Sequence, residues 1–148
     1  METTFNKKPA LSLSTKKREI IFDVITFIFI MLFVYTASNK LMTHESFMKV
    51  LGRSPLLGPF HVLLSYLIPA VEIVLSGLLL LNKTKRLGLI LSLALMLVFT
   101  VYLIYMINSG ATLPCMCGGV ISSLSWKQHI FFNLGFIVLA IAGLRLYK

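Results

Sequence analysis

Four apolar segments, each long enough to cross a lipid bilayer, constrain the fold of this chain more than any other feature of its sequence. A membrane-spanning helix needs about 20 predominantly apolar residues to cross about 30 Å of hydrocarbon. Of the 148 residues, 57% are hydrophobic and only 13% charged, unlike the composition of a soluble domain. The sequence therefore predicts an all-α integral membrane protein, in which residues 19–148 form one four-helix bundle. The expected helices cover about 19–37, 60–81, 87–107 and 127–144.

Lysine and arginine are distributed unevenly between the two ends of this expected bundle. Ten of the 14 lie in the N-terminal arm, in the turn at 83–86 and in the C-terminal tail. The other four are assigned to the opposite side: Lys40, Lys49, Arg53 and Lys127. The positive-inside rule then makes residues 1–18 a flexible basic cytoplasmic arm and places both termini in the cytoplasm of a bacterium. The bilayer of the inner membrane accounts for the net charge of +9, so nucleic acid is not expected as a partner.

The first outer loop, over residues 38–59, is polar but contains a short amphipathic stretch. Its apolar residues are Phe47, Met48, Val50 and Leu51. This pattern is typical of a short interfacial helix that lies on the membrane surface.

The two cysteines of the chain, Cys115 and Cys117, are separated by one residue in the break between the third and fourth apolar segments. The predicted topology places this loop in the periplasm, where thiols can be oxidised and stay oxidised. A disulfide that closes so small a ring is strained and exchanges easily. It also adds little stability, because it closes almost no loop. The spacing therefore favours a redox-active dithiol over a structural disulfide.

Two other interpretations of the cysteine pair stay open. The pair supplies too few ligands for a structural zinc site, and we expect no such metal. Copper(I) accepts soft ligands, and Met116 or Met106 could complete its coordination, so copper handling is an alternative. The cysteines could also have no chemical role.

The second apolar segment is interrupted by Pro69. Glu72 lies near its middle, at a depth where an acidic residue marks a function or a buried partner. The sequence assigns no lysine or arginine to the same depth. We therefore predict an uncharged Glu72 that acts either as a proton relay or as a structural hydrogen-bonding group. Its expected partners are Thr100, Tyr102 or Asn133.

The fourth apolar segment begins with Trp126, and His129 and Asn133 follow it at a spacing that places both on one face of a helix. Because the cysteine loop lies just upstream, this face is a candidate contact for the head group of a membrane quinone. His129 would relay a proton there. Interfacial anchoring by Trp126 and helix-packing hydrogen bonds by His129 and Asn133 are the alternatives.

Three segments of the chain together resemble a known family. Tyr35-Thr36-Ala37-Ser38-Asn39-Lys40-Leu41 and the stretch from Ile68-Pro69-Ala70-Val71-Glu72 to Leu80 resemble the DoxX-like membrane superfamily. Pro114-Cys115-Met116-Cys117-Gly118-Gly119 is similar to the cysteine loop of the MauE branch of that superfamily. The resemblance covers the chain from the first to the fourth apolar segment.

The resemblance implies a redox role in the membrane. MauE-like proteins are implicated in disulfide formation in periplasmic methylamine dehydrogenase, and the layout is more distantly similar to quinone-dependent disulfide generators of the vitamin K epoxide reductase kind. Two features depart from these patterns: Asn39 replaces a frequent glycine, and the chain has one cysteine pair instead of two. We therefore expect a thiol–disulfide oxidoreductase that exchanges directly with a thioredoxin-like or other periplasmic thiol protein. A non-enzymatic subunit that anchors or assembles a redox complex is the alternative.

Overall fold

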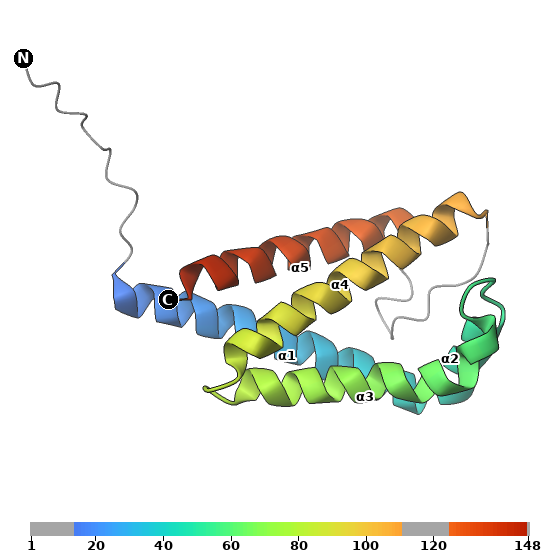
Figure 1. Cartoon of the computed structure of the whole chain (residues 1–148), viewed down its shortest axis with the longest axis horizontal. Coiled ribbons are helices and arrows are strands. Elements are labelled where there is room, and N and C mark those ends of the chain that lie inside the picture. Colours follow the sequence, from blue (N-terminus) through green and yellow to red (C-terminus); the bar gives the residue numbers. More distant parts are fainter. Residues whose placement is uncertain (1–13, 111–124, 148) are drawn as a thin grey trace, which may run out of the picture.

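The computed structural model describes residues 14–110 and 125–147, and this part of the chain is helical, without strands (Figure 1). Four of its helices are long and apolar enough to cross a membrane, which confirms the predicted all-α class. The elements in chain order are α1 (Thr15–Met42), α2 (His44–Gly52), the 3-10 turn η1 (Gly58–Phe60), α3 (His61–Leu80), α4 (Lys85–Asn108) and α5 (Trp126–Leu146).

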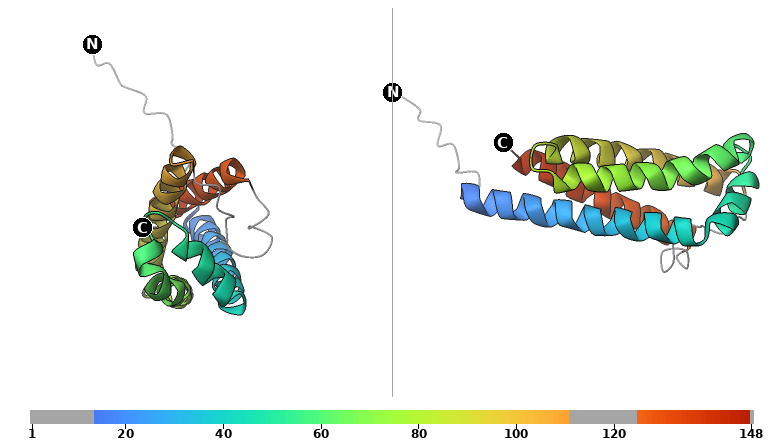
Figure 2. Two further views of the ribbon diagram at one scale, coloured as in Figure 1. Left: turned by 90° about the vertical axis from the view of Figure 1, so that its right-hand side faces the viewer. Right: turned by 90° about the horizontal axis from the view of Figure 1, so that it is seen from below.

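The long helices form a four-membered bundle in which α1 contacts α3, α3 contacts α4, α4 contacts α5, and α5 returns to α1 (Figure 2). Its core contains Phe29 and Phe33 of α1, and the ring of Phe29 meets Phe136 of α5 edge-on, with 5.2 Å between the centroids. Large apolar side chains also cover the outside of the bundle. Such an exterior suits a lipid environment, where helices satisfy their own backbone groups.

Two details of the first half differ from the sequence-based expectation. α1 continues to Met42, so Lys40, assigned to the outer loop, is part of a buried helix face. Pro69, expected to interrupt the second span, lies fully buried within a continuous α3. The expected short helix after the first span is present as α2, and its residues Phe47 and Leu51 are buried.

α2 lies at one end of the bundle, together with the C-terminal ends of α1 and α4 and the N-terminal ends of α3 and α5 (Figure 1). The other end carries the turn between α3 and α4 and the two outermost described residues, Ser14 and Tyr147. The segment that contains the two cysteines joins α4 to α5, so it connects two helix ends at the α2 end.

Helices α1, α4 and α5 pack closely around Gly143, and a first prediction concerns this residue. A Cβ atom on Gly143 of α5 would lie 2.9 Å from Leu89 Cδ2 of α4 and 3.4 Å from Ile25 Cγ2 of α1. Leu89 and Ile25 are buried, so neither can move away freely. Gly143→Leu should therefore lower the free energy of unfolding by about 1–3 kcal/mol, the usual effect of overpacking.

The matched control is Gly135→Leu on the same helix. Apart from its chain neighbours and the backbone of its own helix, no heavy atom of the described residues lies within 4 Å of a Cβ built on Gly135, so the new side chain should be tolerated. Unfolding of both variants in detergent micelles, followed by circular dichroism, measures the difference. Equal stabilities would show that α5 does not pack as closely as the structure has it.

A candidate ligand-binding cavity

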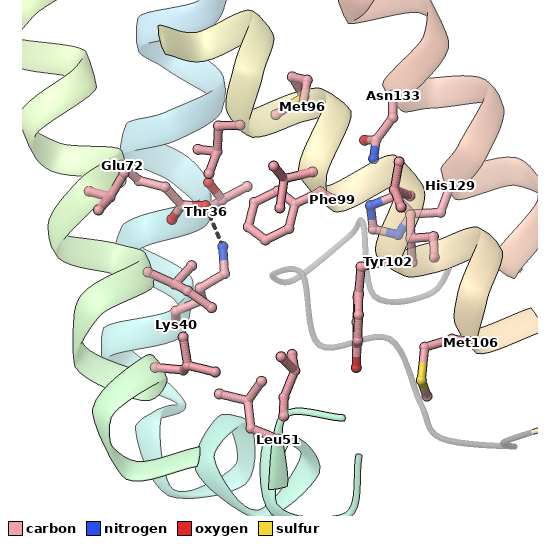
Figure 3. A pocket seen from close by; sticks show the side chains of 18 of the residues that line it. Thr36, Lys40, Leu51, Glu72, Met96, Phe99, Tyr102, Met106, His129 and Asn133 are labelled. Carbon is pink, nitrogen blue, oxygen red and sulfur yellow. Dashed lines mark hydrogen bonds and ion pairs between the residues drawn. The ribbon is translucent and has the colours of Figure 1, made fainter. Parts of the chain in front are cut away.

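A cavity of about 600 Å³ lies inside the bundle in the half nearest α2 (Figure 3). All five α-helices contribute to its wall, which is mostly apolar. A few side chains in the wall are polar or ionisable: Thr36, Lys40, Glu72, Tyr102, Tyr105, His129 and Asn133. Cavities of this volume that combine an apolar wall with a few polar groups are typical of sites for small molecules.

The first polar group of the cavity is an ion pair between α1 and α3. Lys40 Nζ donates to Glu72 Oε1 at 2.6 Å, and the two residues are 4% and 2% exposed. The premise that no cation lies at the depth of Glu72 is therefore wrong, because α1 extends further than expected and carries Lys40 inward. The predicted partners are not confirmed either. Thr100 donates to Met96 O at 2.7 Å, and Tyr102 donates to Ser54 Oγ at 2.9 Å.

The ion pair leaves hydrogen-bonding capacity unused. Glu72 Oε2 is buried and has no hydrogen-bond partner among residues 14–110 and 125–147. The hydroxyl of Thr36 lies close to the Glu72 carboxylate (Figure 3), but it donates to the backbone, to Phe33 O at 3.3 Å, which leaves Oε2 unpaired in this part of the chain. A lysine ammonium has three N–H donors, and among the described residues Lys40 has one hydrogen-bond acceptor, Glu72 Oε1, with the ring centroid of Phe47 6.0 Å from its Nζ.

The second polar group of the cavity consists of His129 and Asn133 on α5. Both residues are buried, at 4% and 3% exposed, and both line the cavity, as their spacing predicts for one helix face. The start of α5 is fixed by a capping box, in which Ser125 Oγ accepts from Gln128 N and Gln128 Oε1 accepts from Ser125 N. The cap fixes where α5 begins, and His129 lies in its first turn, where its backbone N donates to Ser125 O at 3.0 Å.

The two polar groups lie on different sides of the cavity. In Figure 3, Lys40 and Glu72 are on the side of α1 and α3, and His129 and Asn133 on the side of α5, with the ring of Phe99 projecting between them. The cavity therefore has two polar ends with apolar wall between them.

α2 and its connections close the cavity at the end of the bundle. Phe47 and Leu51 of α2 belong to the wall. His44 Nε2 lies 3.1 Å from Ser65 Oγ of α3, and the hydrogen bond from Tyr102 to Ser54 ties the segment after α2 to α4. α2 is thus held on the bundle from both sides, with its buried residues toward the cavity.

The structure describes only some of the remaining predicted site residues. Cys115 and Cys117 lie outside the described residues, and so does the side chain of Trp126, although Trp126 is the first residue of α5. Met106, considered as a copper(I) ligand, is 1% exposed and lines the cavity. Within the described residues, no group of three or more His, Cys, Asp or Glu side chains could hold a metal ion.

Comparison with known proteins identifies a family. The profile of the family described as "Methylamine utilisation protein MauE" matches residues 18–146. No curated protein and no solved structure matches the chain significantly.

Proposed function

The chain belongs to the MauE family, and from this premise we propose that it is a thiol–disulfide redox protein of the bacterial inner membrane. Cys115 and Cys117 form its exchangeable disulfide, on the periplasmic side. The partner is a thioredoxin-like or other periplasmic protein that carries a pair of thiols. The Cys-x-Cys spacing supports this proposal, because a disulfide in so small a ring exchanges readily.

The observation that carries the proposal is the position of the cavity. It lies in the half of the bundle where α4 ends and α5 begins, and the cysteine-bearing segment joins these two helix ends. A ligand bound in this cavity could therefore accept the electrons of a reduced cysteine pair within the membrane domain. A membrane quinone matches this cavity, because the apolar wall can contact its ring and substituents and the polar side chains can bind its oxygens.

The proposed cycle has two balanced exchanges. A thiolate of the partner attacks the Cys115–Cys117 disulfide, a mixed disulfide forms, and the second partner thiol resolves it. The partner leaves with a disulfide, and Cys115 and Cys117 are left as thiols. Oxidation of these thiols back to the disulfide then releases two electrons and two protons, for which a membrane quinone held by His129 and Asn133 would supply the two-electron acceptor.

The residues of α5 support the second exchange. His129 lies in the cavity wall, and its imidazole can donate or accept a hydrogen bond and transfer a proton to a ligand oxygen. Asn133, one turn further along the same face, offers an amide donor to a ligand oxygen. Apolar residues around them exclude water, which strengthens each hydrogen bond that these groups make.

Trapping of the mixed disulfide tests this function. With Cys115→Ser and Cys117→Ser as separate variants, one of the two should accumulate a disulfide-linked complex with a periplasmic protein. Its remaining thiolate attacks the disulfide of the oxidised partner, which reverses the first exchange, and the second cysteine that would displace the partner is missing. The complex is detected on non-reducing gels and disappears on reduction. Met116→Ala, which keeps both thiols, is the matched control and should not accumulate the complex.

Failure of both single variants to trap any partner would refute the exchange mechanism. The double Cys→Ser variant separates the proposal from the anchoring alternative. If cells with the double variant keep normal levels and activity of the partner, the protein acts as an anchoring or assembly subunit instead.

A further inference from the structure

The Lys40–Glu72 pair presents the cavity with a donor and an acceptor side by side. Lys40 has N–H donors beyond the one that Glu72 Oε1 accepts, and Glu72 Oε2 has no partner among the described residues. A buried polar atom without a partner is unfavourable, and a ligand that satisfies it is favoured accordingly. The chemical group that matches a neighbouring donor and acceptor is a hydroxyl, which both accepts and donates.

A carbonyl group fits this end of the cavity less well. Its oxygen could accept from Lys40, but it has no hydrogen to donate and would leave Glu72 Oε2 unsatisfied. The pair thus distinguishes a hydroxyl from a carbonyl at the same position. This is the difference between the reduced and the oxidised form of a quinone.

The opposite end of the cavity restricts the ligand further. His129 and Asn133 form a second polar end, and Phe99 projects between the two ends (Figure 3). A molecule that reaches both ends needs two oxygens separated by a flat apolar body. A benzene ring with hydroxyl groups at opposite positions has this form, and the volume of about 600 Å³ leaves room for an alkyl substituent.

We infer that the cavity binds an apolar aromatic 1,4-diol, with one hydroxyl accepting from Lys40 and donating to Glu72, and that it prefers this diol to the corresponding quinone. The inference rests on the proposed function, since it specifies which redox form of the acceptor the site retains. The binding itself does not require the cysteines.

Equilibrium binding to the purified full-length protein with both cysteines replaced by serine tests the inference. The probes are a decyl-substituted benzene-1,4-diol, its quinone and its dimethyl ether, titrated in detergent micelles by calorimetry. The diol should bind about tenfold more tightly than the other two, the effect of one additional hydrogen bond to a charged group. Equal affinities for the diol and the ether would overturn the inference.

Two variants test whether the ion pair causes the preference for the diol. The Lys40→Met/Glu72→Leu double variant removes both charges together and should bind all three probes with equal, weaker affinity. Glu72→Gln keeps an acceptor for Lys40 but replaces Oε2 by an NH₂ donor, so its preference should reverse toward the quinone. A diol preference that persists in both variants would contradict the assignment.

The Asp23→Asn/Lys85→Met double variant is the matched control. Its ion pair has a similar N···O distance of 2.7 Å but lies near the other end of the bundle, with the Asp23 side chain 60% exposed. It should retain the diol preference of the parent protein. Because the binding protein lacks both thiols, diol binding without any trapped partner would refute the proposed exchange alone, whereas trapping without diol preference would refute this inference alone.

Discussion

Lys40→Met should lower the free energy of unfolding by about 3–5 kcal/mol, because it leaves a buried carboxylate without its cation. Lys40 and Glu72 are both almost completely buried, and their side-chain atoms lie 2.6 Å apart. Once the ammonium is removed, Glu72 has no other cation within salt-bridge distance among the described residues. The desolvation of the acid then opposes folding without compensation. Unfolding in mixed micelles measures the change.

The Lys40→Met/Glu72→Leu double variant should recover most of that loss. Replacing both members of a buried pair by apolar residues of similar size is often neutral or even stabilising, because no charge is then desolvated. The surface comparison is Lys85→Met, whose partner Asp23 is largely exposed and therefore screened by water. That variant should lose less than about 1 kcal/mol. If Lys40→Met were no more harmful than Lys85→Met, the pair would not be buried as the structure has it.

The Lys40→Met/Glu72→Leu double variant also separates the contribution of the ion pair to stability from its contribution to ligand binding. If the double variant folds well but loses its preference for the diol, the ion pair is retained in the protein for binding and not for folding. A buried ion pair is weak evidence for stability in any case. Its position in the wall of a cavity, with one carboxylate oxygen unpaired among the described residues, agrees with a binding role.

The sequence predicts the helical architecture because membrane spans are encoded locally. Each span needs a long apolar run, and the run alone identifies it. The ends of the helices are less well determined, since hydrophobicity marks the part of a helix in contact with lipid and not its full hydrogen-bonded length. α1 illustrates this difference: it continues through the polar residues Ser38 and Asn39 to Met42.

A signal for the position of Lys40 is nevertheless present in the sequence. The buried residues of α1 recur every three or four positions: Phe22, Ile25, Thr26, Phe29, Ile30, Phe33, Thr36, Ala37 and Lys40. Extended past the end of the apolar run, this helical period places Lys40 on the inner face. If Lys40 is instead assigned to the outer loop together with Lys49 and Arg53, this helical period is not recognised.

The pairing of Lys40 with Glu72 cannot be deduced from either helix alone. It depends on how α1 and α3 are rotated and shifted against each other, which the packing of many side chains determines. By contrast, the joint position of His129 and Asn133 follows from the helical period, and the structure places both in the cavity wall. Their role as quinone contacts stays a prediction.

His129→Phe should reduce the rate of quinone reduction by the dithiol form of the protein about 100-fold, within the usual contribution of a positioned proton donor. His129 is 4% exposed and lines the cavity, and its ring lies 6.4 Å from that of Phe132, so an aromatic replacement fits the space. Absorbance of a soluble quinone analogue, mixed with the pre-reduced protein, gives the rate in a single turnover.

Three further measurements distinguish proton transfer from a structural effect of this substitution. Trapping of the partner disulfide should be unchanged in a His129→Phe protein that also carries Cys115→Ser or Cys117→Ser, because the first exchange does not use the histidine. The solvent deuterium isotope effect on quinone reduction should increase, since proton delivery becomes the slow step. His61→Phe, the same change at a histidine whose Nδ1 lies 2.7 Å from Gly58 O and which is not part of the cavity wall, should leave the rate within about twofold. Equal rates for His129→Phe and the parent protein would remove His129 from the proposed mechanism, whereas a parallel loss of trapping would show that the substitution disturbs the fold.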